Sequence, residues 1–450
     1  MRQGVIVCKI ISCIRFIPLR RSIKYKQSTN ILLKYAERSK NMPDMKPSFM
    51  IPHLMNLGGL ANWPKANVVR TALVTELIPE LCKMPYDYLF RDDPKAMTEC
   101  TLLVWEYLDL DILTANLDVY DFEAEAMGAK IKFFPRNCPD FDRSEYFIKG
   151  REDFDKIKYP GFNAGRLPFL KKINEYQLQY VSFPAFPVMS APWTLAGNLY
   201  GLDNLIIATM EDPEFVHDYL NKLVDDFLIP MWNDIIDNFP GVDTMALVDA
   251  FVTVPMVTVD IIDEFIRPAL ERLNNGTKVK LPLLDTAFFG QSKLNKEDLA
   301  RFEDFVIWSN GRFFCSDPDV AILTPEYARK RADEVLLPLQ TGIDAKVLEQ
   351  GTREEIVERI KHYTLAGKRG ITPCIFFYNN FTPRTSEEKL QIAVQALKIY
   401  GTPEADENTP YVDPEFISFK DFVANKIKNN VEGYSFEWLE KSGLKEELGL

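Results

Sequence analysis

The chain has 450 residues, 46% hydrophobic and 26% charged, so it is long enough for one large domain or two ordinary ones and resembles neither a collagenous nor a broadly disordered protein. Its formal net charge of −12 argues against a non-specific nucleic-acid binder, which would present a basic face. Seven scattered cysteines, an odd number with no CxxC pair, favour free thiols in a reducing compartment over a disulfide framework.

Residues 1–41 form a basic leader. They contain ten Lys or Arg and one acidic residue, a net charge of +9, so the rest of the chain carries −21 where the whole carries −12. Lys9 and Arg15 interrupt the apolar run, which argues against a spanning helix of about 20 mostly apolar residues. The composition resembles an organelle transit peptide, and the alternative is a start assigned too far upstream of Met42 or Met45. No other segment approaches a membrane span, so we expect a cytoplasmic protein, with organelle targeting left open by the leader.

The first part of the body alternates between strand and helix patterns. Insertion 116–178 contains candidate extra strands in "AKIKFFP". The other predicted elements are strands at 48–53 ("SFMIPH"), 110–115 ("LDILTA") and 179–190 ("QYVSFPAFPVMS"), with helices near 66–82 and 95–107 and a helix after Asp212-Pro213.

Five further apolar runs each precede a helix. The runs are "TMALVDAF" (244–251), "KVKLPLLD" (278–285), "RFFCSD" (312–317), "EVLLPLQTGID" (334–344) and "ITPCIFF" (371–377). The helices carry their own start and stop signals: a stop at Asn274-Asn275-Gly276, N-caps at Asn295 and Thr324, capping boxes at Thr352-x-x-Glu355 and Thr385-x-x-Glu388, and a stop at Gly401.

This order predicts an α/β protein with a parallel sheet, because each of the last seven of eight strand candidates leads into a helix. Eight such units over about 360 residues favour a (β/α)8 TIM barrel with an insertion after strand 2 and short peripheral extensions. No GxGxxG or GxxxxGK[ST] follows a strand, which weakens the nucleotide-binding alternative. We therefore expect the basic leader at 1–41, the barrel at 42–402 and a peripheral helical tail at 403–450.

In a barrel of this kind the chemistry lies where the strands end. Several apolar strands in this chain end in carboxylates, a more specific signal than any one residue. The polar residues at the predicted strand ends are His53, Asp111, Ser190, Asp249, Asp285, Asp317, Gln340, Asn379 and Asn380.

Four stretches together resemble the uroporphyrinogen decarboxylase superfamily. They cover roughly residues 48–401, and their order and spacing carry the resemblance more than any single motif. The stretches are "EYLDLDILTANLDVYDFEAEAMGAKIKF" (106–133), "SAPWTLAGNLYGLDNLIIATMEDPEFVHDYL" (190–220), "VDAFVTVPMVTVDIIDEFIRPAL" (248–270) and the run from "GIDAKVLEQGTREEIVERIKHY" to "TPRTSEEKLQIAVQALKIYG" (342–401).

The resemblance implies a (β/α)8 barrel and one of three activities. One branch decarboxylates a tetrapyrrole without a cofactor, another transfers methyl groups between zinc-bound thiols and corrinoid proteins, and a third demethylates small methyl donors onto a corrinoid protein. The decarboxylases carry an Arg-rich first-strand segment that would bind substrate carboxylates, whereas the corresponding region of this chain, "FMIPHLMNLGGLANWPKANVVR", has no arginine before Arg70. The thiol methyltransferases use His-x-Cys on the fifth strand and a later Cys as zinc ligands; in this chain "LPLLDTA" stands at that strand, and we expect no family-type metal site.

These departures favour a corrinoid-dependent methyltransferase that takes a methyl group from a small O- or N-methyl donor, with the corrinoid (cobalamin) carried by a partner protein and no tightly bound cofactor. Loss of an ether oxygen requires a general acid or a Lewis acid, and the candidates are Asp249, Asp285, Asp111 and His53. A quaternary ammonium donor would instead use aromatic neighbours of Asp249. The expected substrate-binding residues are Trp193, Tyr200, Ser190, Gln340 and Asn380, and a homodimer is a family-level expectation.

Each candidate also has a purely structural interpretation. Asp285 would cap a turn, His53 would be a structural histidine, Trp193 would only pack, and Asp109 or Asp118 would replace Asp111. The alternatives for the whole chain are a uroporphyrinogen decarboxylase of porphyrin biosynthesis and a non-catalytic homologue that binds a tetrapyrrole or corrinoid. Phenylalanines that fill the mouth of the barrel would favour the non-catalytic homologue.

Overall fold

The structure is a computed structural model that describes residues 68–111, 120–181, 188–239, 242, 246–278, 289–310 and 312–450. The chain divides into two units, Met1–Pro47 and Ser48–Leu450, and every described residue belongs to the second. The predicted strand at 48–53 and most of the predicted strand at 278–285 lie outside the described residues, as do His53 and Asp285.

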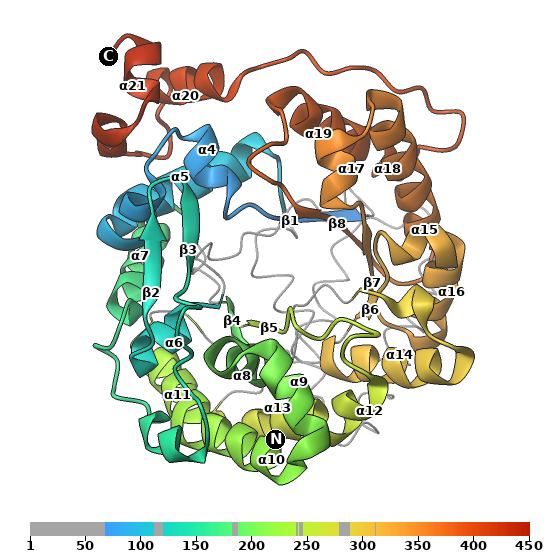
Figure 1. The fold of residues 1–450 in the computed structure, drawn as a ribbon. Helices are drawn as coiled ribbons and strands as arrows, with labels where there is room; N and C mark the ends of the chain where they lie inside the picture. Colours follow the sequence, from blue (N-terminus) through green and yellow to red (C-terminus); the bar gives the residue numbers. More distant parts are fainter. Residues whose placement is uncertain are drawn as a thin grey trace, which may run out of the picture. The chain divides into compact units, whose positions relative to one another are not determined.

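Strands and helices alternate along the described chain, and Figure 1 shows the helices lying outside the parallel strands. The strands are β1 Val68–Leu73, β2 Ile131–Phe134, β3 Asn137–Phe141, β4 Val188–Ser190, β5 Ala246–Val248, β6 Phe313–Phe314, β7 Leu339–Gly342 and β8 Cys374–Asn380. The α-helices are α4 Leu77–Leu81, α5 Pro94–Tyr107, α6 Phe122–Met127, α7 Leu167–Tyr180, α8 Pro192–Tyr200, α9 Leu202–Glu211, α10 Pro213–Lys222, α11 Ile229–Asn238, α12 Val259–Ile261, α13 Arg267–Gly276, α14 Lys296–Asn310, α15 Asp319–Leu323, α16 Pro325–Val335, α17 Ala345–Gln350, α18 Arg353–Lys368, α19 Glu387–Tyr400, α20 Phe419–Lys428 and α21 Leu444–Leu448. Short 3-10 or π turns are η2 Tyr88–Asp92, η3 Arg151–Lys156, η4 Leu223–Leu228, η5 Ile262–Ile266, η6 Gln291–Lys293 and η7 Glu437–Lys441.

The parallel strands form two sheets among the described residues. One has four strands in the order β1-β8-β7-β6, and the other pairs β4 with β5. The hairpin β2–β3 is antiparallel and confirms the extra strands predicted inside insertion 116–178. The α/β class with a parallel sheet is therefore confirmed, while a closed barrel does not appear among the strands that the structure describes.

The structure corrects the predicted helix near 66–82, because Val68–Leu73 forms strand β1 and helix α4 covers only Leu77–Leu81. The run Val68-Val69-Arg70-Thr71 is rich in β-branched residues, which fit a pleated sheet better than a helix. Its partner is β8, more than 300 residues away, with Val69 opposite Ile375 and Thr71 opposite Phe377. Such a distant partner leaves no local signal in the sequence.

The predicted strand at 179–190 is also corrected: α7 extends to Tyr180 and β4 begins only at Val188. The helix predicted near 95–107 is confirmed as α5, and the helix after Asp212 as α10, whose first turn is capped by the Asp212 carboxylate. Predicted strands 244–251, 312–317 and 334–344 contain β5, β6 and β7, and predicted strand 371–377 covers the first half of β8, which runs on to Asn380.

Most of the predicted helix starts are confirmed by side-chain hydrogen bonds. The Asn295 Oδ1 accepts from two backbone amides, and the Thr324 and Thr352 hydroxyls each accept from the amide three residues later. The capping box predicted at Thr385 is wrong by one residue. Ser386 caps α19 instead, because its hydroxyl accepts from the amide of Lys389.

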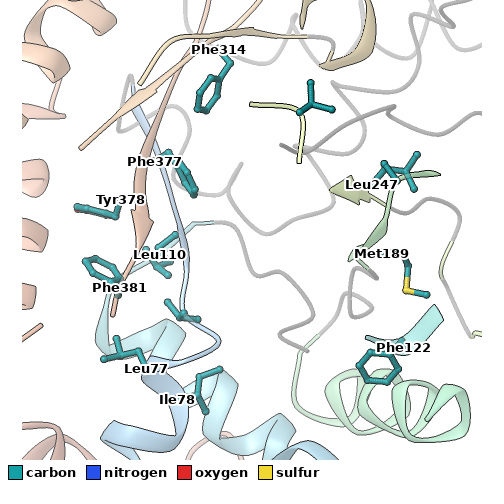
Figure 2. Close-up of a cluster of buried hydrophobic side chains, with 14 of the residues drawn as sticks. Leu77, Ile78, Leu110, Phe122, Met189, Leu247, Phe314, Phe377, Tyr378 and Phe381 are labelled. Carbon is teal, nitrogen blue, oxygen red and sulfur yellow. The ribbon is translucent and has the colours of Figure 1, made fainter. Parts of the chain in front are cut away.

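The two faces of β8 can be assigned from contacts with helices. The Cys374 sulfur lies against Gly367 of α18, and the Tyr378 hydroxyl donates to the Ala393 carbonyl of α19, so these side chains face the helices. Alternation then places Ile375 and Phe377 on the opposite face. Figure 2 shows Tyr378 and Phe377 on opposite sides of the strand.

The C-terminal segment 403–450 packs on the early helices through α20, η7 and α21. The buried Glu99 carboxylate of α5 accepts hydrogen bonds from the backbone amides of Ser435 and Phe436, 2.9 and 3.0 Å long. No helix within the described ranges has the length and apolar character needed to cross a membrane.

Candidate active site

The neighbouring parallel strands β4 and β5 both end in polar residues that the fold brings together (Figure 1). Ser190 is the last residue of β4 and lies opposite Val248, and Asp249 comes directly after β5. Both side chains are fully buried. The carboxyl ends of parallel strands share one edge of a sheet, which is where α/β proteins place their sites.

Thr194 on α8 holds the Asp249 carboxylate. Pro192 begins α8, which makes Thr194 the third residue of the helix, one of those whose backbone amide has no partner inside the helix. Asp249 Oδ1 accepts from this amide at 3.0 Å and from the Thr194 hydroxyl at 2.5 Å. The hydroxyl oxygen in turn accepts from the backbone amide of Phe251 at 3.1 Å, which fixes its rotamer.

Burial raises the pKa of Asp249 to about 7, against an ordinary value of 3.8, while the two hydrogen bonds from Thr194 act in the opposite direction. A carboxyl group with such a pKa is partly protonated at neutral pH. It can therefore donate a proton to a reacting group or accept one from it.

A second buried carboxylate lies beside this pair. Glu123, on α6, accepts a hydrogen bond at Oε1 from the backbone amide of Ser190. Burial, followed by the charges of Asp249 and Glu123, raises the pKa of Tyr120, which places its phenol near both acids. We call Tyr120, Glu123, Ser190, Thr194 and Asp249 the β4–β5 cluster.

The structure separates the two aromatic residues expected beside Asp249. Trp193 is fully buried in the core next to Thr194. Tyr200 lies six residues further along α8, about 9 Å along the helix axis, where its ring packs on Phe215 and Tyr219. Trp193 and Tyr200 therefore do not form a cage around a cation at Asp249.

Asp111 lies on the helix side of the sheet in an ion pair. Both of its oxygens contact the Arg70 guanidinium, at 2.8 and 2.9 Å, and Asp109 binds the same guanidinium. Arg70 is opposite Phe376, on the β8 face that packs against helices. The structure thus does not bring Asp111 to Asp249, and it pairs both Asp109 and Asp111 with a cation.

The remaining predicted residues are spread over the second sheet. Gln340 is buried on β7 opposite Ile375, on the face turned away from α18 and α19. Asn380, the last residue of β8, lies opposite Leu73 of β1, and its side-chain amide donates to the Glu76 carboxylate at 3.1 Å. Both lie at or near strand ends, away from the β4–β5 cluster in the strand order.

Among the residues that the structure describes, no group of three His, Cys, Asp or Glu lies close enough to hold a metal ion. The predicted fifth strand, with Asp285, and the segment with His53 lie outside those residues. The structure thus leaves the roles predicted for Asp285 and His53 as predictions.

Three members of the cluster were not among the predicted site residues. Thr194 lies within "PWTLAG", and its role depends on Asp249, 55 residues later. Glu123 and Tyr120 belong to "YDFEAEAMG", where an acidic residue at the start of a short apolar helix resembles an ordinary exposed one. Full burial of Glu123 is the distinguishing property, and it depends on tertiary packing.

The chain has relatives of known family. The family model described as uroporphyrinogen decarboxylase (URO-D) matches residues 88–400. A methylated-thiol–coenzyme M methyltransferase from Methanosarcina mazei is 26% identical over 223 residues, which cover 48% of this chain and 57% of that protein, so the chain spans little more than half of this curated relative. A solved methyltransferase from Methanosarcina mazei shares the fold with a TM-score of 0.57 at 16% identity, over 76% of this chain and 96% of that one.

Proposed function

We propose that this chain, which belongs to the uroporphyrinogen decarboxylase family, is a methyltransferase that moves a methyl group from a small O-methyl donor to a corrinoid carried by a partner protein. The observation that carries the proposal is the buried Asp249 carboxyl at a strand end, with a pKa of about 7. The partial match to a coenzyme M methyltransferase supports methyl transfer as the reaction class.

Asp249 acts as the general acid in this proposal. As the methyl carbon passes to the acceptor, its bond to oxygen breaks and the electron pair stays on the leaving oxygen. The Asp249 carboxyl gives that oxygen its proton, so the products are an alcohol or phenol, the methylated acceptor and the Asp249 carboxylate. A proton from solvent restores the acid for the next cycle. General acids of this kind contribute about 10²- to 10⁴-fold to the rate.

Thr194 positions the acid and stabilises the carboxylate that forms. Its hydroxyl and amide both donate to Oδ1, and these two hydrogen bonds stabilise the charge that remains when the proton has left. An O-methyl donor is favoured over a quaternary ammonium donor because Trp193 and Tyr200 do not gather beside Asp249. The corrinoid is the second substrate of the reaction, delivered by its own protein.

The architecture that we propose is the (β/α)8 barrel at 42–402 expected from the sequence, with a peripheral tail at 403–450. Most of the predicted strands at 110–115 and 278–285 lies outside the described residues. Six described parallel strands with intervening helices and the family match support this architecture. Asp285 and Ser190 would then lie at the same mouth, with Gln340 and Asn380 on the opposite wall.

Uroporphyrinogen decarboxylation is the alternative activity. It requires cations for the substrate carboxylates, and the one arginine of β1, Arg70, is already held by Asp109 and Asp111. This pairing supports the methyltransferase over the decarboxylase.

The test is methylation of cob(I)alamin, followed by its absorbance change, with a panel of methoxylated aromatic compounds and methylated amines. We expect turnover with an O-methyl donor and a loss of about 100-fold or more in Asp249→Asn. Asp413→Asn, at an exposed ion pair with Arg353, is the matched control and should keep wild-type activity. Wild-type activity in Asp249→Asn would remove Asp249 from the mechanism, and release of carbon dioxide from uroporphyrinogen would establish the alternative.

A further inference from the structure

A cavity of about 280 Å³ lies between the insertion hairpin and α8, and its lining shares no residue with the β4–β5 cluster. Three segments form its wall: residues 128–130 after α6, residues 141–149 with Lys156, and Asn198 of α8. Small-molecule sites begin at roughly 300 Å³. The cavity is therefore the size of a small metabolite.

The wall is fixed by contacts between its segments. The Ile148 amide donates to the Leu199 carbonyl of α8 at 3.0 Å, which ties the 141–149 segment to the helix. Tyr146 packs directly on Gly201, where φ is +95° and an added Cβ would meet the ring at 2.8 Å. Gly201 has both the conformation and the absence of a side chain that this contact requires. The cavity is thus a built feature of the fold.

Asn198 gives the cavity an unsatisfied hydrogen-bond acceptor. Its side chain lines the cavity and is only 5% exposed, yet its Oδ1 accepts no hydrogen bond among the described residues. A buried acceptor without a donor costs about 1–3 kcal/mol. A donor supplied by a ligand would remove that cost.

The wall also has an excess of positive charge. Two carboxylates and four cations line it: Asp142, Glu145, Lys130, Arg143, Lys149 and Lys156. Both carboxylates are neutralised, since Asp142 pairs with Lys132 at 2.7 Å and Glu145 with Lys149 at 2.7 Å. Arg143 and Lys156 are paired in turn, with Asp140 at 3.1 Å and with Asp153 at 2.7 Å. Lys130 makes no ion pair within 4 Å among the described residues, and its charge helps to lower the pKa of Glu145. An anion in the cavity would meet at least the Lys130 ammonium group.

We propose that this cavity binds a small organic hydroxy acid. The carboxylate of the ligand would pair with Lys130, and its hydroxyl would donate to Asn198 Oδ1. An amino acid fits less well, because its ammonium group would lie near Lys130, the wall cation that has no ion pair within 4 Å among the described residues. The rings of Phe141 and Phe147, also in the lining, would pack on the carbon skeleton.

The test uses two dicarboxylates that differ by one hydroxyl group, malate and succinate, titrated calorimetrically into the full-length protein. The wild type should bind malate about tenfold more tightly than succinate, the ratio that corresponds to one hydrogen bond worth about 1.4 kcal/mol. Asn198→Leu should abolish this preference and leave succinate binding unchanged. Lys130→Gln should weaken both ligands, and Lys330→Gln, at an exposed lysine of α16, should weaken neither.

Lys130 is exposed, so Lys130→Gln leaves the fold intact and decides the question even if Asn198→Leu does not fold. Absence of saturable binding of both acids to the wild type would overturn the proposal. So would equal affinity for malate in the wild type and Lys130→Gln. Neither result depends on methyl transfer, so the cavity and the proposed function are tested separately.

Discussion

Replacing Asp249 with Asn should change how stability depends on pH. The folded chain holds the Asp249 proton up to a pKa of about 7, whereas the unfolded chain releases it near the ordinary value of 3.8. A difference of about 3 pKa units, at about 1.36 kcal/mol for each unit, corresponds to roughly 4 kcal/mol. Asn has nearly the same shape as Asp and carries no charge, so Asp249→Asn is expected to lack this pH-dependent contribution to the free energy of unfolding.

The direction follows from the raised pKa. For a carboxyl group whose folded pKa is above its unfolded pKa, the contribution to stability is complete below about pH 4 and is lost as pH rises to about 7. The free energy of unfolding of the wild type should therefore fall relative to Asp249→Asn between pH 5 and 8. About 3 kcal/mol of the total falls in that window.

Urea unfolding of both proteins at pH 5, 6, 7 and 8 measures this difference. Asp413→Asn is the control, because Arg353 lowers the pKa of that exposed carboxyl and its titration lies below the window. Its stability curve should run parallel to the wild type. Parallel curves for Asp249→Asn as well would refute the reasoning, since they would mean that the folded chain, like the unfolded chain, has already released the Asp249 proton by pH 5.

Three further outcomes follow from the contacts described. Asp111→Asn should lower the free energy of unfolding by about 1.5–3 kcal/mol in urea titrations, because the half-buried Arg70 guanidinium loses its bidentate partner and keeps only Asp109. Activity per folded molecule should not change, and a loss of activity would return Asp111 to the site. Thr194→Val removes a hydrogen bond that stabilises the Asp249 carboxylate, so the pKa of Asp249 should rise by about one unit, and the pH above which methyl transfer declines should rise with it. A pH–rate profile equal to that of the wild type would contradict this. Glu99→Gln should weaken the anchoring of the C-terminal segment and speed its cleavage in limited proteolysis by about tenfold; unchanged cleavage would show that packing alone holds the segment.

The α/β class and the family were predictable because both depend on patterns within short stretches. Strand–helix alternation, caps such as Thr352 and each quoted motif are read from continuous stretches of chain, without knowledge of tertiary contacts, and the structure or the family match confirms them. The strand β1 was not predictable in this way. Its β-branched residues are ambiguous locally, and its partner β8 is more than 300 residues away.

The site was predictable only in part. A polar residue at the end of an apolar strand has a sequence signal, and this signal found Ser190 and Asp249, which the structure places on neighbouring strands. Burial and pairing have no such signal. Asp111 matched the same pattern but contacts Arg70 on the helix side, and Glu123 matched no pattern yet lies at the cluster.

What separates Asp249 from the other buried carboxylates at described strand ends is the kind of donor that holds it. Asp317, after β6, is buried like Asp249 but accepts from the Arg359 guanidinium at 3.0 Å and from Tyr363 at 2.6 Å. Burial raises the pKa of Asp317 as well, but the Arg359 cation acts in the opposite direction, because a cation favours the charged form of a carboxyl group. Thr194 offers Asp249 only neutral donors, a hydroxyl and an amide. A carboxyl held by neutral donors can keep its position while its charge changes, which is what a general acid must do in every cycle.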